Sequence, residues 1–268
     1  MNTAALEVAE EVVLYEKVGA HIAVVTLNRP KARNAINPEV AQALHRLREQ
    51  IEADDEIRVA ILAGSGGDVF CAGADLKAVT AGRPGASGIS TEGGGFAGFV
   101  KAHRAKPWIA AVRGKAFGGG FELALACDLV VAGKSTQFAL PEAKIGVLAA
   151  AGGAFRIAQA LPRALANEIL VTGKPISADF ALGHGLVNRV VDDADVLDEA
   201  LRLAGEIAQN APLSVKASLE LVRAASELNE EGLWKFNDAW GQRIIRTDDA
   251  KEGPRAFLEK RAPQWTGR

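Results

Sequence analysis

Two glutamates, Glu122 and Glu142, have the chemistry and the surroundings of a catalytic carboxyl pair. Glu122 lies in the apolar run 121–125, and Glu142 follows Pro141. Both fall in the first turn of a predicted helix, where an acidic side chain also stabilises the helix N-terminus by about 0.3–1 kcal/mol without any catalytic role. Burial among its apolar neighbours would raise the pKa of Glu122 toward the range that suits a general acid or base. We therefore treat the two glutamates as candidate catalytic residues.

Runs of small residues stand beside these glutamates. Gly118, Gly119 and Gly120 directly precede the predicted helix of Glu122, and Ala72-Gly73-Ala74 follows another apolar stretch. Consecutive glycines cost conformational entropy and are tolerated where a ligand or another backbone must come close. A helix N-terminus also directs unpaired N–H groups at such a turn. Two facing turns could supply two N–H donors to an oxygen that gains negative charge, or both could simply be close strand-to-helix packing turns.

Residues that commonly bind metals are few and widely spaced in this chain. Its two Cys and four His form no CxxC, HxxxH or HExxH pattern. These spacings are the usual signatures of zinc sites, so we expect no metal centre. Chemistry at the site would then depend on carboxyl groups and backbone N–H donors.

Charge and apolar patterning predict small-molecule partners. A net charge of −2 provides no basic surface for nucleic acid. No apolar run approaches the ~18 residues of a membrane-spanning helix. Residues 1–16 contain four Glu and lack the basic start and apolar run of a signal peptide. We expect a cytoplasmic protein that binds neither nucleic acid nor membrane.

Alternating strands and helices must position the candidate residues. Apolar, β-branched runs predict four strands, at 22–28, 58–64, 108–114 and 129–133. Apolar residues at helical spacing predict a helix from Pro38 to Ala53, with Asn37 as its N-cap. This alternation predicts an α/β fold. Because the chain has 28 Gly, 50 Ala and only 6% aromatic residues, its core must bring backbones close together.

The character of the sequence changes near residue 195. Amphipathic helices are predicted over 195–209 and 212–228 and then from 234 to 257, with no further strand. We therefore predict an α/β catalytic core over 1–195. The helical region 196–268 is expected to pack on that core or on a neighbouring subunit.

A glycine-rich segment interrupts the predicted core. Residues 80–95 contain six Gly, joined by Ser and Thr, and show no apolar periodicity. Such a segment fits a mobile lid beside a site or a flexible surface loop. The sequence does not decide between the two.

Several segments together resemble the enoyl-CoA hydratase/isomerase, or crotonase, superfamily. The segments that carry the resemblance are FCAGADL (70–76), AFGGGFELALACD (116–128) and ALPEAKIG (139–146). It extends to LNRPKARNAIN (27–37), GLVNRVV (185–191) and EGPRAFLEKR (252–261), and so covers nearly the whole chain. Within the superfamily the chain looks most like the carnitinyl-CoA dehydratase branch.

The resemblance implies a fold and a set of site residues. The fold would be an α/β, crotonase-type spiral of repeated ββα units with a C-terminal helical trimerisation region. By motif position, the N–H groups of Ala72 and Gly119 would form an oxyanion hole for the thioester oxygen. Glu122 and Glu142 match the two carboxylates that hydratases of this family place around one water. Which of them is acid and which is base stays open.

The resemblance also implies how coenzyme A is bound. Residues lining its site would be Ala72, Gly73, Ala74 and Asp75. Further candidates are Lys31, Arg33, Phe257 and Lys260, the last two from a neighbouring subunit of a homotrimer or a dimer of trimers. Each of the three cations is equally an ordinary surface residue. No cofactor is expected, because coenzyme A enters as part of the acyl-CoA substrate.

Three activities fit these residues. The first is a hydratase or dehydratase acting across the 2,3 double bond of an enoyl-CoA, which uses both glutamates. The second is a Δ3,Δ2-enoyl-CoA isomerase, which needs one carboxylate base and the oxyanion hole. The third is a CoA-thioester-binding protein with little catalysis. The segment GVLAAAGG (146–153) lacks the proline that many hydratases carry there, so the acyl group stays open.

Overall fold

The computed structural model describes residues 11–81 and 88–268. Our expectations for the first ten residues, and for the middle of the glycine-rich segment at 82–87, lie outside the described residues. Within the described ranges no helix is both long and apolar enough to cross a membrane.

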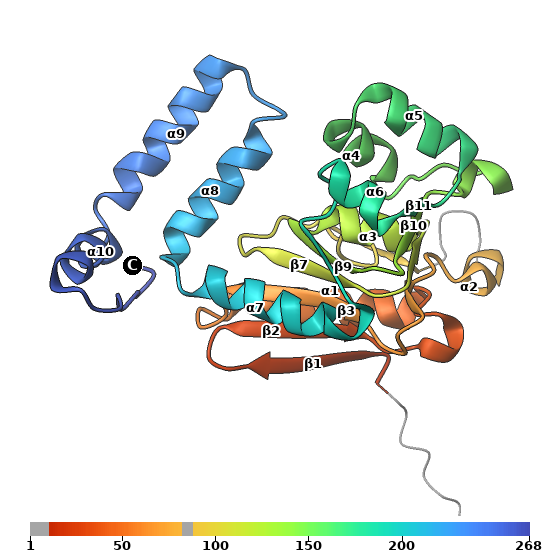
Figure 1. Ribbon diagram of the computed structural model, residues 1–268, viewed down its shortest axis with the longest axis horizontal. Coiled ribbons are helices and arrows are strands. Elements are labelled where there is room, and N and C mark those ends of the chain that lie inside the picture. Colours follow the sequence, from red (N-terminus) through yellow and green to blue (C-terminus); the bar gives the residue numbers. More distant parts are fainter. Residues whose placement is uncertain (1–10, 82–87) are drawn as a thin grey trace, which may run out of the picture.

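A six-stranded sheet forms the centre of the protein (Figure 1). Its strands, in spatial order, are β1 (Val13–Val18), β2 (Ile22–Leu27), β3 (Val59–Gly64), β7 (Trp108–Val112), β9 (Leu129–Gly133) and β12 (Arg189–Val191). β1 runs antiparallel to β2, and all other neighbours are parallel. The four predicted strands are confirmed, since continuous apolar runs suit parallel strands that are buried on both faces. β1 was not predicted, because its sequence, VLYEKV, is not a continuous apolar run: it contains the exposed charged residues Glu16 and Lys17.

A second, smaller sheet lies at the end of the first and carries the candidate residues. Its order is β11 (Ile176–Ser177), β10 (Gln137–Ala139), β8 (Lys115–Phe117) and β4 (Val69–Cys71). Successive strand pairs send one strand to each sheet: β3 and β4, then β7 and β8, then β9 and β10. This produces the expected spiral. The helices α2 (Leu76–Ala81) and α3 (Gly119–Ala126) follow the first two pairs.

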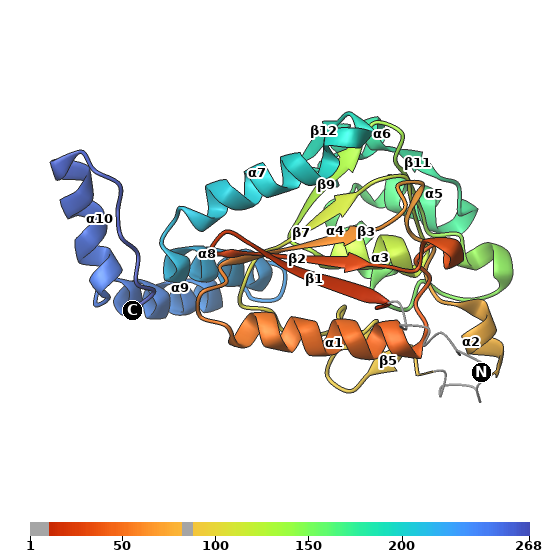
Figure 2. The ribbon, with the colours of Figure 1, turned by 90° about the horizontal axis from the view of Figure 1, so that it is seen from below.

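Helices cover both faces of the large sheet (Figure 2). On one face lies α1 (Pro38–Ala53), which begins as predicted: Asn37 Oδ1 accepts the N–H of Val40 at 3.0 Å. On the other face lies α7 (Val196–Ala208), whose Ala200, Leu203 and Ala204 pack on strand residues such as Ile61. α7 is thus a layer of the core, although our division of the chain at residue 196 grouped it with the C-terminal helices.

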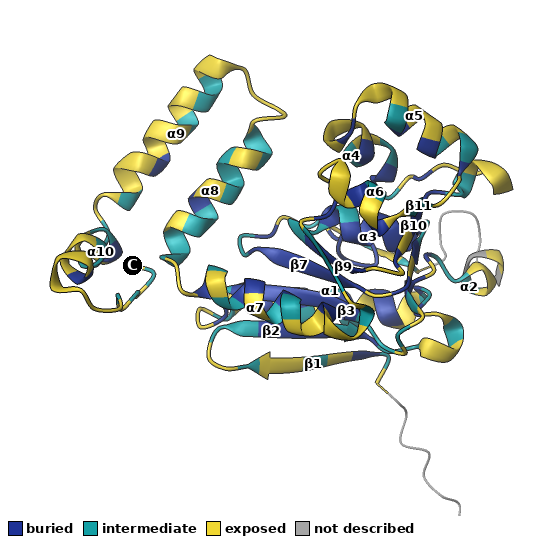
Figure 3. Ribbon diagram, viewed as in Figure 1, coloured by how far each residue is buried: buried dark blue, intermediate teal, exposed yellow. Residues whose placement is uncertain are grey.

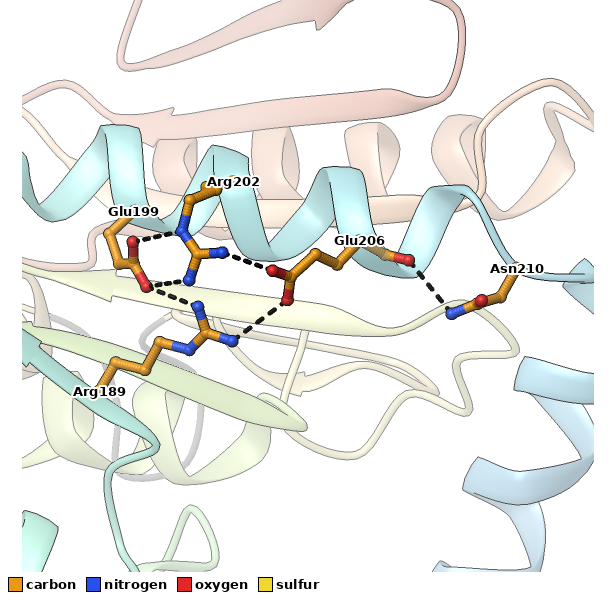
Figure 4. Close-up of polar contacts among 5 residues, drawn as sticks. All are labelled: Arg189, Glu199, Arg202, Glu206 and Asn210. Atoms are coloured by element: carbon orange, nitrogen blue, oxygen red, sulfur yellow. Dashed lines mark hydrogen bonds and ion pairs between the residues drawn. The ribbon is translucent and has the colours of Figure 1, made fainter. Parts of the chain in front are cut away.

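Charged side chains fasten α7 to the edge strand β12. Arg189 donates to Glu199 at 2.6 Å and to Glu206 at 3.2 Å (Figure 4). Arg202 donates to the same two carboxylates, at 2.8 Å to Glu199. Because this network is partly exposed, we expect it to orient α7 rather than to contribute much free energy.

The last three helices stand to one side of the core (Figure 1). They are α8 (Pro212–Ala224), α9 (Glu230–Ile244) and α10 (Asp248–Glu259). Figure 3 shows that most of α9 and α10 is exposed. The run predicted from 234 to 257 is in fact two helices, because the side chain of Thr247 caps α10 by accepting the N–H of Ala250 at 3.1 Å.

Short elements complete the chain. The described part of the glycine-rich segment contains a small hairpin, β5 (Ser90–Thr91) and β6 (Gly95–Phe96), which the absence of periodicity did not predict. The other helices are η1 (Pro30–Ala32), η2 (Glu142–Ile145), α4 (Gly153–Ala160), α5 (Arg163–Thr172), α6 (Ala178–Gly183) and η3 (Asp193–Asp195).

The contact between α3 and β4 predicts a sharp effect of adding one methyl group. A Cβ atom on Gly120 would lie 2.0 Å from the carbonyl oxygen of Cys71, so Gly120→Ala must separate the helix from the strand. We expect the free energy of unfolding to fall by roughly 1–3 kcal/mol or more. In α7, a Cβ on Gly205 would meet nothing within 4 Å. Gly205→Ala should therefore stabilise by about 0.5–1 kcal/mol. Equal urea midpoints for the two variants would contradict this account.

Candidate active site

Two turns of the backbone meet at the centre of the candidate site. One follows β4 and contains Gly73, and the other begins α3 at Gly119. A Cβ atom on Gly73 would lie 2.9 Å from the amide nitrogen of Gly119. Gly73 also has a φ angle of +90°, which side chains rarely adopt. The two small-residue turns, for which the sequence left open either facing N–H donors or close packing, thus face each other, and glycine is needed for the contact.

The turn after β4 has a free N–H at Ala74 rather than at Ala72. The N–H of Ala72 donates to the carbonyl oxygen of Arg33 at 3.0 Å. Ala74 forms a parallel bridge with Ile36, in which the two residues flanking Ala74 make the hydrogen bonds. Within the described residues, the N–H groups of Ala74 and Gly119 have no acceptor. Our assignment of Ala72 as an oxyanion donor is therefore wrong, because its amide is already used.

Glu122 lies in the first turn of α3 and is only 4% exposed. Its Oε1 accepts the N–H of Gly153, the first residue of α4, at 2.8 Å. Burial is the main cause that raises the pKa of Glu122 to about 7, and the charge of Glu142 adds to it. The N–H groups of Gly153 and Ala151 and the positive charge of Arg156 act in the opposite direction. The carboxyl group can therefore take up or release a proton near neutral pH.

Glu142 approaches the same place from the start of η2. A Cβ atom on Gly118 would lie 3.2 Å from its Oε1, so the carboxyl group faces the turn that begins α3. Its Oε2 is buried and has no hydrogen-bond partner within the described residues. Burial raises the pKa of Glu142 as well. A buried, unpartnered carboxyl oxygen fits a group that binds a polar hydrogen of a ligand.

Both carboxyl groups and both free amides line one cavity of about 1330 Å³. Cationic side chains of η1 and its flanks lie along one part of it, namely Arg29, Lys31 and Arg33. Another part is formed by the β5–β6 hairpin and the residues that follow, including Phe96, Val100 and Lys101. Val147, Leu148, Ala150 and Ala151 complete the lining from the segment after η2. The cavity is large enough for an extended ligand with an anionic end and an apolar end.

Most of the residues predicted to bind coenzyme A line this cavity. They are Lys31, Arg33 and the four residues 72–75. The carboxylate of Asp75 accepts hydrogen bonds from Arg29 Nη1 at 3.1 Å and from the N–H of Lys77 at 3.2 Å. Asp75 therefore braces the turn, and Arg29 compensates a charge that would otherwise repel an anionic ligand.

Phe257 and Lys260 do not line the cavity within one protomer. Phe257 is 83% exposed on α10, and Lys260 ends that helix. α10 lies on the opposite side of the molecule from α2, which borders the cavity (Figure 1). Their assignment to a neighbouring subunit's site stays a prediction.

The structure adds residues that sequence reasoning missed. Arg29 compensates Asp75, Gly153 holds Glu122, and the ring of Phe96 covers Gly119, with Cζ 2.5 Å from where a Cβ on that glycine would be. Of these residues, only Arg29 and Gly153 fall in segments that the sequence analysis singled out, 27–37 and 146–153, and neither was given a role. These contacts depend on segments that lie far apart in the chain. In the described parts of the chain, no three His, Cys, Asp or Glu side chains gather as metal ligands.

The raised pKa of Glu122 predicts an unusual dependence of stability on pH. Since that pKa rises from 4.5 to about 7 on folding, the folded chain holds a proton in this interval that the unfolded chain releases. The free energy of unfolding should therefore fall as the pH rises from about 4.5 to 7, by up to ~3 kcal/mol.

Glu122→Gln should remove this loss while keeping an acceptor for Gly153. We expect its melting temperature to exceed that of the wild type above pH 7, and the difference to shrink below about pH 5. Glu168→Gln, an exposed change on α5, is the control and should leave the profile unaltered. A constant difference between Glu122→Gln and wild type at all pH values would contradict the burial of an ionisable group.

Comparison with known proteins agrees with this geometry. The family model described as enoyl-CoA hydratase/isomerase matches residues 17–268. A carnitinyl-CoA dehydratase of Proteus mirabilis is 43% identical over 249 residues, which cover 91% of this chain and 94% of that protein. A carnitinyl-CoA dehydratase of Salmonella typhi shows the same identity and coverage.

Solved structures give the same answer. An enoyl-CoA hydratase from Mycobacterium tuberculosis H37Rv has a TM-score of 0.92 at 40% identity, with 97% of this chain and 100% of that chain covered. One from Bacillus anthracis has a TM-score of 0.90 at 31% identity, with 96% and 100% covered. The facing amides, the carboxyl pair and these similarities lead to one conclusion: the chain belongs to the enoyl-CoA hydratase/isomerase family.

Proposed function

We propose that this protein is a hydro-lyase that adds water to, or removes it from, the 2,3 double bond of an enoyl-CoA thioester. The observation that carries the proposal is the meeting of two carboxyl groups, Glu122 and Glu142, in one cavity with two backbone amides that have no acceptor among the described residues. Membership of the family, and relatives named as carnitinyl-CoA dehydratases and enoyl-CoA hydratases, support the same reaction.

The two amides would stabilise the charge that develops during the reaction. When water attacks C3 of a 2-enoyl thioester, electrons move to the thioester oxygen and form an enolate. We assign the N–H groups of Ala74 and Gly119 to this oxygen. Removing one such donor in other enzymes lowers the rate by about 10²–10³. Because both donors belong to rigid backbone, they need no rearrangement as the charge forms.

The two carboxyl groups would handle the protons. One accepts a proton from the water while the C3–O bond forms, and the other holds the water in position. A carboxyl group then delivers a proton to C2, and the enolate returns to the thioester carbonyl. The OH and the H of one water molecule have then been added to C3 and C2. Dehydration is the reverse sequence. Since the charge of Glu142 raises the pKa of Glu122, we assign the roles of acid and base to the pair and not to one residue each.

This reaction requires no redox cofactor, because adding water neither oxidises nor reduces the substrate. We propose that coenzyme A enters only as part of the substrate, with Arg29, Lys31 and Arg33 near its phosphates. Arginine and lysine are the usual phosphate-binding side chains. Both cysteines are free, in agreement with a proposed location in the cytoplasm.

The residues in the other part of the cavity bear on which acyl group the substrate carries. Carnitinyl-CoA carries a quaternary ammonium group, which proteins bind with aromatic faces or carboxylates. Here Phe96 offers an aromatic face, whereas the positive charge of Lys101 on the same segment opposes a cation. We therefore propose to measure kcat/KM for crotonyl-CoA and crotonobetainyl-CoA side by side, since their ratio reports which influence prevails.

We also propose a homotrimer or a dimer of trimers. Support comes from large apolar side chains that the C-terminal region exposes, including Trp234 at 61%, Ile245 at 74% and Phe257 at 83%. Exposed apolar patches of this kind mark interaction surfaces. A monomer by light scattering at micromolar concentration would rule out this assembly and the shared role of Phe257 and Lys260.

Replacing one carboxyl group tests the reaction directly. Glu142→Gln should lower kcat for hydration of crotonyl-CoA, followed as loss of enoyl-thioester absorbance, by about 10²–10⁴ because it removes a proton carrier. Glu168→Gln on the neighbouring helix α5 is the matched control and should retain full activity. Full activity in Glu142→Gln would refute the mechanism.

Two further assays separate the alternatives. Conversion of a 3-enoyl-CoA to the 2-enoyl isomer without hydration would identify an isomerase. Thermal stabilisation by CoA esters without turnover of any enoyl-CoA or 3-hydroxyacyl-CoA would identify a binding protein.

A further inference from the structure

Three arginines from different parts of the chain donate to three successive carbonyl oxygens beside the cavity. Arg48 Nε donates to Gly98 at 3.1 Å, and Arg104 Nη1 donates to Phe99 at 2.8 Å. Arg156 Nη2 donates to Val100 at 2.6 Å. The first arginine lies on α1, the second between β6 and β7, and the third on α4.

These guanidinium groups donate to the carbonyl groups of a turn, in which the carbonyl oxygen of Phe99 also accepts the N–H of Ala102 at 3.2 Å. Ala97 and Gly98 have φ angles of 56° and 67°, so the backbone turns here and leaves regular pairing. Buried carbonyl groups without partners are costly, and charged donors satisfy them strongly. Arg48 and Arg104 are 7% and 6% exposed, so the turn is held from inside the protein.

The turn forms a wall of the active-site cavity. Phe96, Val100 and Lys101 line the cavity, and the ring of Phe96 covers Gly119. We call residues 96–101 the acyl wall, because we assign the apolar lining of Phe96 and Val100 to the acyl chain and the cations of η1 to the phosphates of coenzyme A. Its position decides how much room remains beside the proposed oxyanion hole.

Arg156 differs from the other two arginines because it also contacts the backbone segment that hydrogen-bonds Glu122. Its Nη1 donates to the carbonyl oxygen of Ala151 at 3.0 Å, while Nη2 holds Val100. The peptide segment 151–153 in turn presents its N–H groups to Glu122, that of Gly153 at 2.8 Å. One guanidinium group therefore joins the acyl wall to the segment that holds a candidate catalytic carboxyl group.

Among the described residues, two charged side chains act on the carboxyl group of Glu122. From η2 the negative charge of Glu142 acts on it, and from α4 the positive charge of Arg156. From β4, the thiol of Cys71 is buried, which raises its pKa to about 12 and leaves it neutral. Arg156 thus supplies the positive charge that opposes the effect of Glu142.

We propose that Arg156 is a positioning residue for the reaction: it fixes the acyl wall and the 151–153 segment against each other, so that the substrate's acyl chain and the carboxyl group of Glu122 keep their relative placement. This inference rests on the proposed hydratase function. Arg48 holds the same wall but makes no hydrogen bond to the 151–153 segment within the described residues, which makes it a matched control.

The experiment compares R156Q, R156K and R48Q. For each variant, kcat and KM are measured with crotonyl-CoA and with a longer straight-chain 2-enoyl-CoA, over a range of pH. In R156Q we expect kcat to fall roughly ten- to hundredfold, since small misplacements of reacting groups have effects of this size. The limb of the pH profile near neutrality should move upward by roughly one unit, because a positive charge near Glu122 is lost.

The two other variants separate geometry from charge. R156K keeps the charge and cannot span both carbonyl groups, so its pH limb should stay in place while kcat falls. R48Q should change the preference between the two acyl chains and leave the pH limb in place. A pH limb that stays fixed in R156Q, or moves equally in R48Q, would overturn the proposal. If R156Q does not fold, wild-type kcat and chain preference in R156K would overturn it.

A readout without turnover distinguishes this inference from the proposed function. The carboxyl pKa of Glu122 can be followed by infrared difference spectroscopy, with E122Q as the reference. Absence of hydration by the wild-type protein would refute the proposed function alone. An unchanged carboxyl pKa in R156Q would refute the role of Arg156 whether or not the protein turns over enoyl-CoA.

Discussion

The site depends on one close contact between two backbones. The turn after β4 and the start of α3 touch with no side chain between them: a Cβ on Gly73 would meet the nitrogen of Gly119, and one on Gly120 would meet the carbonyl oxygen of Cys71. Because of this contact, two N–H groups from separate elements, neither bound to an acceptor in the described part of the chain, lie close together. Glu122 lies in the first turn of the same helix. The contact between the two backbones therefore fixes the positions of both amides and of this carboxyl group.

Placing carboxyl groups beside this contact is costly, since burial disfavours their charged forms. The protein limits the cost with backbone N–H groups at Gly153 and with the charge of Arg156. The remaining penalty keeps the pKa of Glu122 close to neutrality, which is the property that proton transfer requires. Burying Glu122 therefore lowers the stability of the fold, and the same burial gives the carboxyl group the pKa that the proposed chemistry needs. The same guanidinium group also holds the acyl wall, so charge compensation and cavity shape depend on one side chain.

The spiral arrangement explains why such distant segments meet. Each strand pair sends one strand to the large sheet and one to the small sheet, so the ends of β4, β8 and β10 lie at one edge. The turns that leave those ends carry Ala74, Gly119 and Glu142. Packing of α7 on the far face leaves that edge clear, and the C-terminal helices stand away from it (Figure 2).

The sequence by itself determined what depends on neighbours in the chain. Buried strands are visible as apolar runs, α1 as a capped periodic segment, and the carboxyl pair and glycine turns as local composition. Only the tertiary structure decided which amide is free, because Ala72 and Ala74 have the same side chain and differ only in their bonds to residues 33–36. It also decided that Phe257 lies away from the cavity of its own protomer and that Arg156 joins two walls. Local propensity acts over a few residues, whereas these features depend on hydrogen bonds and charges between segments that only folding brings together.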